Sequence, residues 1–458
     1  MGFGEVLDSI ASLVDKSLVR QNDGLDGEAR FTLLETIREY AIGRLQERGE
    51  LESLRRVHAE RYLAVAEAAE PELVRASQRV WLERLDEENA NLRAALAWSM
   101  EVGEIETGLR IAGALVRFWS TRGLMAEGRT WLADALARAD GVPERVRAKA
   151  EFAAGYAALG VGDFQAAKEN FERSLTLARA TDDKGAEAAA LAQIGWLVMA
   201  AGSHERAHAL VAKSLELSTE LGDKVTASGA TNTLAEMASA TGDYEQAVAL
   251  LEQGLGLRRE LGDKRLIANS LLSLGRTELA RGDTERALYR LTEGLALARE
   301  VKDTWSIGVA AATLASVRLT ENDPDAAASL FGEGLAIARD RGDRRLASEC
   351  LQGTAFVASA AGDNERAARL LGSADALLES IGAKRTPIEL AIRERFEPVV
   401  RGGLGEDRYR TATREGSDLS LDDVLPLAIG ADAAAAAAQP PPPLARSTVL
   451  APTPDRTS

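Results

Sequence analysis

The sequence predicts an all-α superhelical solenoid, on the basis of a 40-residue repeat and a composition that favours helix. Alanine, leucine, glutamate and arginine dominate, whereas aromatic residues make up only 5%. A fixed period of this length is typical of architectures in which each unit packs on the next. The recurring positions are a glycine or asparagine (Gly162, Gly202, Gly242, Gly282, Asn322, Gly362), an aspartate or serine (Asp163, Ser203, Asp243, Asp283, Asp323, Asp363) and an alanine (Ala167, Ala207, Ala247, Ala287, Ala327, Ala367).

Length and charge agree with a repeat protein that does not bind nucleic acid directly. A single compact core would normally split into domains at 458 residues, but a solenoid escapes that limit because each repeat contacts only its neighbours. The net charge is -16, from 71 acidic and 55 basic residues. Nonspecific phosphate binding needs clustered Lys and Arg, so direct nucleic-acid binding is not expected. The net charge alone does not exclude a local basic patch.

The cysteine content and the hydropathy of the sequence indicate the cellular compartment of the protein. Cys350 is the single cysteine, so no intrachain disulfide can form, which fits the cytoplasm. It shares a repeat phase with Ala190, Ala230, Ser270 and Ala310, so we expect a buried small residue. The sequence has no run of 18 or more apolar residues and no apolar N-terminal segment, so neither a membrane span nor a signal peptide is expected.

Residues 1–48 differ from the rest of the chain. Apolar residues recur at helical spacing from Val6 to Val14, and residues 17–20 and 30–33 flank a turn rich in Gly and Asp. A second helix is predicted over 34–47. This order matches the late part of a winged helix, and we interpret it as a small winged-helix remnant that packs between domains. The segment has 6 basic and 9 acidic residues, which argues against reading DNA.

The sequence of residues 49–146 predicts degenerate helical repeats that follow no strict period. Helices are expected near 51–69, 78–102, 105–122 and 126–139, with Pro71 and Pro143 in the breaks. Four tryptophans occur here at helical spacing, and large aromatics in this pattern usually belong to the core. They are Trp81, Trp98, Trp119 and Trp131.

Residues 147–385 contain six regular repeats, each predicted to hold two helices. A small residue lies twelve positions before each repeat alanine and lets the two helices approach closely; these residues are Gly155, Gly195, Ala235, Gly275, Ala315 and Ala355. The repeat glycine ends one helix in a left-handed conformation, and the aspartate after it caps the next. Asn322 and Ser203 are the exceptions, and both residue types suit these roles.

A second turn follows the second helix of each repeat, with glycine at positions such as Gly222, Gly262 and Gly342. Asp182 and Lys302 replace this glycine in two repeats. A lysine in the left-handed conformation costs on the order of 1 kcal/mol. We therefore expect the turn at Lys302 to bend differently.

A small residue, a glycine seven positions later and an alanine twelve positions later form the pattern of the tetratricopeptide repeat, here with a period of 40 rather than 34. In addition, Leu33–Ala41, His58–Glu60 and Trp81–Leu96 resemble the signal-transducing NTPase regulators related to MalT-like and AfsR-like proteins of LuxR type. The resemblance covers roughly residues 1–430. It implies an NTPase core in a longer homologue and a solenoid that recognises a partner or effector; the NTPase motifs themselves do not carry over, because this sequence lacks that domain.

The last part of the chain departs from the period. Residues 386–430 predict a C-terminal helical cap, with one helix from Pro387 through Phe396, Pro398 after it, and a last helix over 419–425 that Ser420 caps. Residues 431–458 predict a disordered tail rich in Ala and Pro.

Two motifs resemble catalytic or nucleotide sites, and the repeat explains both. His204–His208 matches H-E-x-x-H, a zinc motif, but Glu205 and Ala207 occupy ordinary repeat positions and no third histidine lies nearby. Gly123–Thr130 is close to a P-loop, but Arg129 replaces the lysine and no strand precedes it, so we expect a helix–helix turn. With no catalytic set of residues either, we expect no metal, no cofactor and no enzymatic activity.

Candidate binding residues come from the position that each first helix turns toward the concave face. They are Tyr156, Trp196, Asn232, Glu236, Asn269, Arg276 and Phe356. Their mixed polarity suits a peptide or small ligand held by hydrogen bonds and an ion pair; a solvated face is the alternative.

The function that the sequence favours is a non-enzymatic solenoid that senses an effector or binds a protein or peptide in a bacterial transcriptional or signal-transduction regulator. One alternative is a transcription factor that binds DNA through residues 1–48. Another is an accessory part of an ATPase or cyclase.

Overall fold

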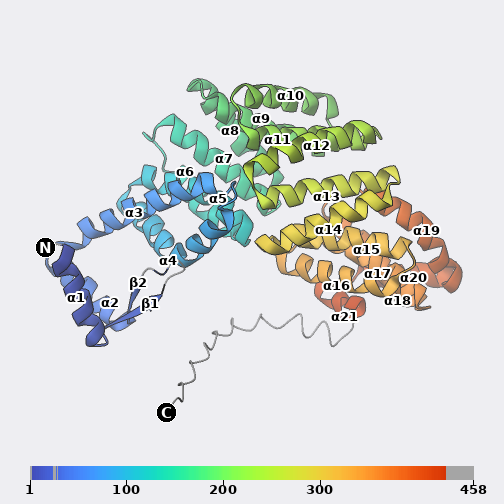
Figure 1. Cartoon of the computed structure of the whole chain (residues 1–458). Coiled ribbons are helices and arrows are strands. Elements are labelled where there is room, and N and C mark those ends of the chain that lie inside the picture. The colour runs from blue at the N-terminus through green and yellow to red at the C-terminus, as the bar shows by residue number, and fades with distance from the viewer. Residues whose placement is uncertain (1–2, 24–26, 28, 430–458) are drawn as a thin grey trace, which may run out of the picture. The chain divides into compact units, whose positions relative to one another are not determined.

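The computed structural model describes residues 3–23, 27 and 29–429, and within them the chain is helical apart from two short strands (Figure 1). The all-α solenoid predicted from the repeat is confirmed. The tail at 431–458, for which disorder is predicted, lies outside the described residues.

The N-terminal part has the predicted order of helix, ribbon and helix. It consists of α1 (Phe3–Asp15), β1 (Val19–Asp23), β2 (Ala29–Leu33) and α2 (Glu35–Glu47). The strands pair antiparallel, with Val19 opposite Leu33. That this part is the remnant of a winged helix stays a prediction.

Four helices then form the degenerate part: α3 (Leu51–Glu72), α4 (Gln78–Val102), α5 (Ile105–Arg122) and α6 (Met125–Leu136). Pro143 lies in a break as predicted, directly before α7. Pro71 does not, because it occupies the last turn of α3, one residue before the helix ends. The tryptophans belong to the core as expected: Trp98 and Trp119 are buried, and Trp81 and Trp131 pack against the same cluster.

Six helix pairs follow, one for each regular repeat. They are α7 (Glu144–Gly160) and α8 (Phe164–Ala180), α9 (Lys184–Ala200) and α10 (His204–Glu220), α11 (Lys224–Ala240) and α12 (Tyr244–Leu261), α13 (Lys264–Arg281) and α14 (Thr284–Val301), α15 (Thr304–Thr320) and α16 (Pro324–Arg341), and α17 (Arg344–Ala360) and α18 (Asn364–Ser380). The small residues have the expected role: a Cβ on Gly155 would lie 2.7 Å from the Phe171 ring of the next helix.

The C-terminal cap contains more helix than predicted, with α19 (Pro387–Leu404), α20 (Glu406–Ser417), which was not predicted, and α21 (Leu421–Ile429). The first of these helices was expected to end at Phe396, before Pro398, but it continues through Pro398. The proline removes one backbone hydrogen bond, and burial of Val400 in the following turn offsets that loss. Ser420 caps α21 as predicted, since its hydroxyl accepts a bond from the Asp423 N–H at 3.2 Å.

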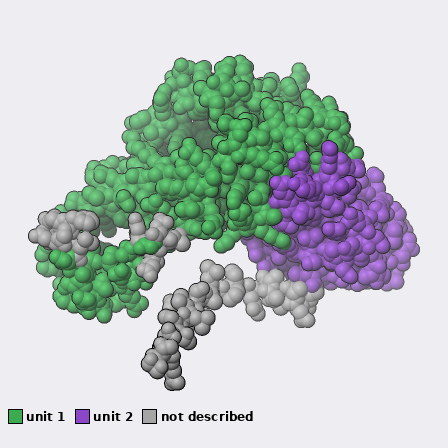
Figure 2. All heavy atoms as spheres, in the orientation of Figure 1, with its two compact units in different colours: residues 1–281, 296–303 green, residues 282–295, 304–458 purple. Residues whose placement is uncertain are grey.

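The contacts divide the chain into two compact units (Figure 2). Unit 1 comprises residues 1–281 and 296–303, and unit 2 comprises residues 282–295 and 304–458. The largest buried cluster of unit 1 surrounds Phe118 and Trp119, whereas that of unit 2 surrounds Phe331 and Phe356. Cys350 is buried in unit 2, as its repeat phase predicts.

Aspartate caps the helix that follows each repeat glycine. The side chains of Asp163, Asp243, Asp283, Asp323 and Asp363 each accept a hydrogen bond from the backbone N–H three residues on, at 3.0 to 3.2 Å.

Ser203 was expected to cap in the same way, and this expectation is wrong: its hydroxyl makes no cap hydrogen bond. The backbone explains the difference. Ser203 has ψ 68°, as the capping aspartates do, whereas Thr386, whose hydroxyl does cap, has ψ 160°. The shorter hydroxyl side chain therefore caps where the backbone is extended, and the longer aspartate is needed in the repeat turns.

The turn at Lys302 does not bend differently, contrary to expectation. Lys302 has φ 56° and Asp182 has φ 49°, close to the 66° of Gly342. The reason is the backbone hydrogen bond that closes the turn. It runs from the Asp303 N–H to the Ala298 carbonyl at 2.9 Å, matching the Asp343 to Ala338 bond at 2.8 Å, and it requires the left-handed residue. Asn322, with φ 65°, is left-handed as predicted.

Replacing Lys302 by glycine should therefore stabilise the protein. The exposed Lys302 side chain makes little contact, so Lys302→Gly mainly removes backbone strain and should raise the free energy of unfolding by about 1 kcal/mol, measured by urea denaturation. Asn322→Gly is the matched control and should gain less, because asparagine tolerates this conformation. An equal gain in both variants would contradict this explanation.

Candidate functional site

Six of the predicted binding residues lie on the first helices of unit 1, and all of them are half-buried, so that protein and solvent both contact them. Equivalent positions in successive first helices place them on one surface. Asn269 and Arg276 are two turns apart on α13 and therefore share a face. We call this set the inner surface: Tyr156 on α7, Trp196 on α9, Asn232 and Glu236 on α11, and Asn269 and Arg276 on α13.

Glu236 accepts hydrogen bonds from two of these residues. The Asn232 amide donates to its carboxylate at 2.8 Å, and the Trp196 indole N–H donates to it from the neighbouring helix. Burial raises the pKa of Glu236 to about 7, although both hydrogen bonds and the charges of Arg258 and Arg276 act in the opposite direction. The inner surface thus contains a carboxyl group that titrates near neutral pH.

Three arginines that interact with the inner surface or with each other were not predicted. Arg258 comes from α12 and is buried among neutral acceptors: Ser270 Oγ at 2.7 Å, the Leu266 carbonyl at 3.0 Å and Ser228 Oγ at 3.3 Å. Burial lowers its pKa to about 10. The repeat does contain a signal for this residue, because the other five repeats have uncharged residues at the position of Arg258. These residues are Ala178, Ser218, Ala298, Ala338 and Leu378.

The other two arginines are Arg117 on α5 and Arg265 on α13. Arg265 donates a hydrogen bond to the Tyr156 hydroxyl. Burial lowers the pKa of Arg117, the charge of Arg265 lowers it further, and the charge of Asp263 raises it. Arg117 belongs to the degenerate helices, so no repeat register could reveal that it meets residues of α7 and α13.

Unit 1 also contains a contact between distant parts of the chain, which we call the closing contact. The turn between α3 and α4 meets the turn between α12 and α13: the Gln78 amide donates to the Leu73 carbonyl at 2.6 Å and, 185 residues away, to Asp263 Oδ1 at 3.3 Å. Gln78 and Asp263 are both buried. A Cβ on Gly262 would lie 3.0 Å from Ala76 Cβ and 3.1 Å from its backbone nitrogen. The charge of Asp263 also acts on Arg258 and Arg265.

Phe356, the seventh predicted residue, does not present a free surface. It lies on α17 of unit 2, is 0% exposed and stacks on Phe396 of α19, with ring centroids 5.4 Å apart. The C-terminal cap covers the position where a ligand was expected. We therefore leave Phe356 out of the proposed binding surface.

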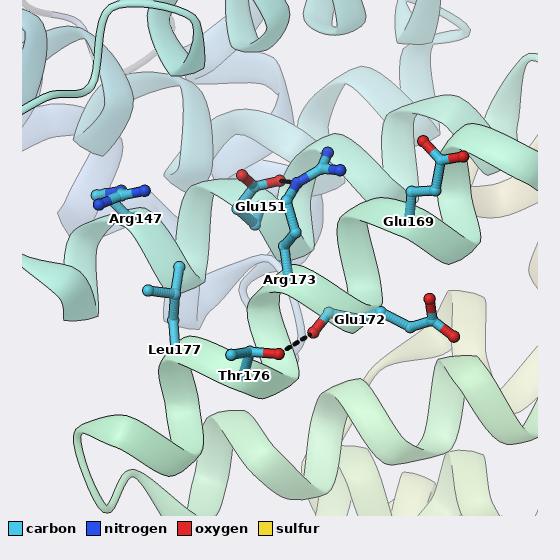
Figure 3. A pocket seen from close by; sticks show the side chains of 7 residues that line it. All are labelled: Arg147, Glu151, Glu169, Glu172, Arg173, Thr176 and Leu177. Atoms are coloured by element: carbon cyan, nitrogen blue, oxygen red, sulfur yellow. Dashed lines mark hydrogen bonds and ion pairs between the residues drawn. The ribbon is translucent and has the colours of Figure 1, made fainter.

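A separate hollow of about 440 Å³ opens between α7 and α8 (Figure 3). Glu151 and Arg173 form an ion pair at 3.0 Å in its wall, and burial raises the pKa of Glu151 despite that pair. A second hollow of about 410 Å³ shares these two residues. Glu151 and Tyr156 are five residues apart, about 140° around α7. The hollow therefore lies on a different face of α7 from the inner surface, and its most buried charge, Glu151, already has a partner in Arg173.

The two rejected motifs have ordinary structural roles. His204 and His208 are exposed on α10, and the described part of the chain has no group of three His, Cys, Asp or Glu residues placed to hold a metal ion. Gly123, with φ 72°, ends α5 at the predicted helix–helix turn, and Arg129 pairs with Asp163 at 2.6 Å. None of the helices in the described residues has the length and apolar character needed to cross a membrane.

Comparisons with known proteins agree with this architecture. Family models of the tetratricopeptide repeat match residues 226–300 and 148–181. Over 126 residues, 28% of this chain, the sequence is 40% identical to proteins named "Putative HTH-type transcriptional regulator", Mb0914c of Mycobacterium bovis and Rv0890c of Mycobacterium tuberculosis. The match spans 14% of the length of each of these relatives.

Solved structures share the fold at low identity. A Rap protein complexed with competence and sporulation factor has a TM-score of 0.53 at 13% identity, covering 80% of this chain and 94% of that one. A Signal Transduction ATPase with Numerous Domains, with a tetratricopeptide repeat sensor, from Pyrococcus horikoshii has a TM-score of 0.53 at 14% identity, covering 89% of this chain and 57% of that one. The chain thus has the fold of a tetratricopeptide-repeat solenoid, a class suited to protein interaction.

The raised pKa of Glu236 makes stability depend on pH. A carboxyl group with a folded pKa near 7 and an ordinary value of 4.5 favours folding while it is neutral, and this contribution is lost as the pH rises through 7. Glu236→Gln should therefore stabilise the protein at pH 8, by about 2 kcal/mol after allowance for solvent screening, and much less at pH 5. Urea denaturation at both pH values measures this. The exposed Glu205→Gln is the control, and a Glu236→Gln effect that is the same at both pH values would contradict the prediction.

The closing contact can be tested with two glycines of the same conformation. Gly262 and Gly222 have φ of 76° and 67°, so alanine strains the backbone equally at both, but only Gly262 has a neighbour within 4 Å of its added Cβ. Gly262→Ala should lose about 1 kcal/mol more than Gly222→Ala in free energy of unfolding. Hydrogen exchange should show the extra loss of protection in the turns at 73–78 and 262–263. Equal losses in both variants would show that the contact contributes nothing.

Proposed function

We propose that this chain is the effector-sensing and protein-interaction part of a bacterial cytoplasmic regulator of transcription or signal transduction, and that it has no enzymatic activity of its own. The observation that carries the proposal is the hydrogen-bonded group of Trp196, Asn232 and Glu236 on the inner surface. It combines an aromatic face, an amide and a carboxyl group, all half-buried, and so offers both apolar and polar contacts to a ligand.

The effector that we propose is a short peptide. Successive first helices place polar side chains in a row along one surface. Such a row suits an extended peptide better than a compact molecule. The structures with this fold support the choice, because one is a Rap protein complexed with competence and sporulation factor and another is a Rap conjugation gene regulator of plasmid pLS20 in complex with the Phr* peptide.

The regulator that we propose resembles the MalT-like and AfsR-like NTPases, in which a longer homologue contains the NTPase domain. The names of the mycobacterial relatives and the sensor of the Pyrococcus ATPase support this context. An accessory role beside an ATPase or cyclase domain would use the same inner surface.

DNA binding through residues 1–48 is the second candidate, since the mycobacterial relatives are named as HTH-type regulators. The charges of this part argue against it. Arg30 pairs with Glu87 and Glu88 of α4, at 3.1 and 2.5 Å, and is thereby removed from phosphate contact. Arg38 and Arg44 also pair with carboxylates of their own helix.

Binding of synthetic hexapeptides tests the proposal. Three pools of hexapeptides, acidic, neutral and basic, are titrated into the full chain by calorimetry, and at least one pool should bind. Trp196→Ala and Asn232→Ala should each weaken that binding by about tenfold, because each removes a contact of order 1 kcal/mol. Tyr289→Ala, which truncates an aromatic residue that is 67% exposed, is the control and should change nothing.

Two outcomes would overturn the proposal. If no pool bound, or if binding survived both inner-surface variants, the inner surface would not be the sensor. Saturable, sequence-dependent binding of promoter DNA in a gel-shift assay would instead support the second candidate.

A further inference from the structure

We infer that the hollow between α7 and α8 is a second ligand site, and that it binds a basic amino acid such as lysine or arginine. The hollow has a volume of about 440 Å³ and lies on a different face of α7 from the inner surface, so this inference goes beyond the proposed peptide effector. It begins from two charged residues of α7, Arg147 and Glu151, that interrupt the pattern of the repeats.

Glu151 is a buried charge at a position where the other five regular repeats have uncharged residues. These residues are Leu191, Thr231, Leu271, Ala311 and Leu351, and all of them are buried. The fold therefore does not require a charge here, and taking a carboxylate out of water is costly. An ion pair with Arg173 at 3.0 Å offsets part of that cost, but burial still raises the pKa of Glu151.

Arg147 lines the hollow one helical turn before Glu151 and is half-buried. Its side chain makes no hydrogen bond or ion pair with any residue in the part of the chain that the structure describes. None of the other five repeats has a basic residue at this position; the residues there are Glu187, Ala227, Ile267, Ile307 and Ala347. Arg147 and Arg173 carry two positive charges against the one negative charge of Glu151, so this end of the hollow attracts a carboxylate.

The walls of this end are held in place before a ligand arrives. The buried Ser174 hydroxyl of α8 donates to the Ala148 carbonyl of α7 at 2.9 Å. Arg173 donates from Nε to Glu151 and from one terminal nitrogen to the side chain of Asn170. These two bonds fix the plane of the guanidinium, and its other terminal nitrogen can donate to a ligand. A positioned guanidinium loses little freedom when a carboxylate binds.

Two exposed carboxylates from α8, Glu169 and Glu172, also line the hollow. Figure 3 shows Arg147 at one end of the hollow and Glu169 at the other. The present contacts of both carboxylates are weak ones at the surface: the Gln165 amide donates to Glu169 at 2.7 Å, and Lys168 lies 4.0 Å from Glu172. Both carboxylates can therefore bind the cation of a ligand.

The separation of these charges selects the ligand class. The antiparallel helices α7 and α8 pair at Glu151 and Arg173, so Arg147, one turn earlier, lies opposite Leu177. Glu169 is eight residues from Leu177, about 12 Å along α8. A basic amino acid suits this span, because a flexible aliphatic chain separates its carboxylate from its side-chain cation. Leu177 offers an apolar contact to that chain.

L-Lysine is the probe. Norleucine, which lacks the side-chain ammonium, and cadaverine, which lacks the carboxylate, are its matched counterparts. Calorimetry on the full chain at low salt should show one saturable site for lysine. Norleucine and cadaverine should each bind at least about tenfold more weakly, because each of them loses one ion pair. L-Arginine should compete with lysine for the same site.

Two substitutions test the two ends of the hollow. Arg147→Met should weaken lysine binding about tenfold. Glu169→Gln should weaken the binding of lysine and leave that of norleucine unchanged, because norleucine has no side-chain cation. Arg145→Met is the control, since the exposed Arg145 donates to the Thr181 carbonyl at 3.4 Å and does not line the hollow. This variant should bind lysine as the unchanged protein does.

Glu151→Leu separates a ligand site from a structural role. Leucine is the residue that three of the other repeats have at this position, and it removes a buried charge. The variant should therefore unfold at the same or a higher urea concentration, while its lysine binding falls at least about tenfold because Arg173 is no longer positioned. Unfolding at a clearly lower urea concentration would show that the carboxylate is structural and would contradict the inference.

Three further results would overturn the inference: no saturable binding of lysine or arginine, equal affinity for lysine, norleucine and cadaverine, or unchanged lysine affinity in Arg147→Met. The outcome is separate from that of the proposed peptide effector. Trp196→Ala, on the inner surface, should leave lysine binding unchanged, so either site can fail while the other stands.

Discussion

The structure depends on how each repeat helix ends. A left-handed residue closes one helix through a backbone hydrogen bond, and an aspartate then caps the next. Because that hydrogen bond requires the left-handed conformation, Asp182 and Lys302 adopt it despite the strain. Uniform turns keep the helices in register, and within unit 1 this register places one position of each of the first helices α7, α9, α11 and α13 on the same surface. Trp196, Asn232 and Glu236 meet for that reason.

The period made much of the fold predictable, because the same physical requirement recurs every 40 residues. It located the helix ends, the left-handed Asn322 and the close approach at Gly155. The prediction that Ser203 caps its helix failed. Serine is generally a good N-cap residue, but the ψ angle at this position suits the longer side chain of aspartate. Predictions also failed where tertiary packing outweighed a helix-breaking residue, as at Pro398, where burial of Val400 sustains the helix.

The candidate site was predictable only in part. The register identified the polar residues of the first helices, and it contains the signal for Arg258, the one charged side chain in a column of small and apolar ones. It could not find Arg117, which lies in helices without a strict period. It could not exclude Phe356 either, because helix α19, which covers that residue, lies outside the repeats. Contacts between parts of the chain far apart in sequence leave no periodic trace.

The closing contact has a consequence for how unit 1 unfolds. An array of repeats that touch only their neighbours behaves as a one-dimensional chain, in which the ends fray and each repeat opens almost independently. The bond from Gln78 to Asp263 spans 185 residues and links the start of α4 to the start of α13, which are not neighbours in the array. Because this bond ties the two ends of the segment between α4 and α13, the helices of that segment should open together as one cooperative unit.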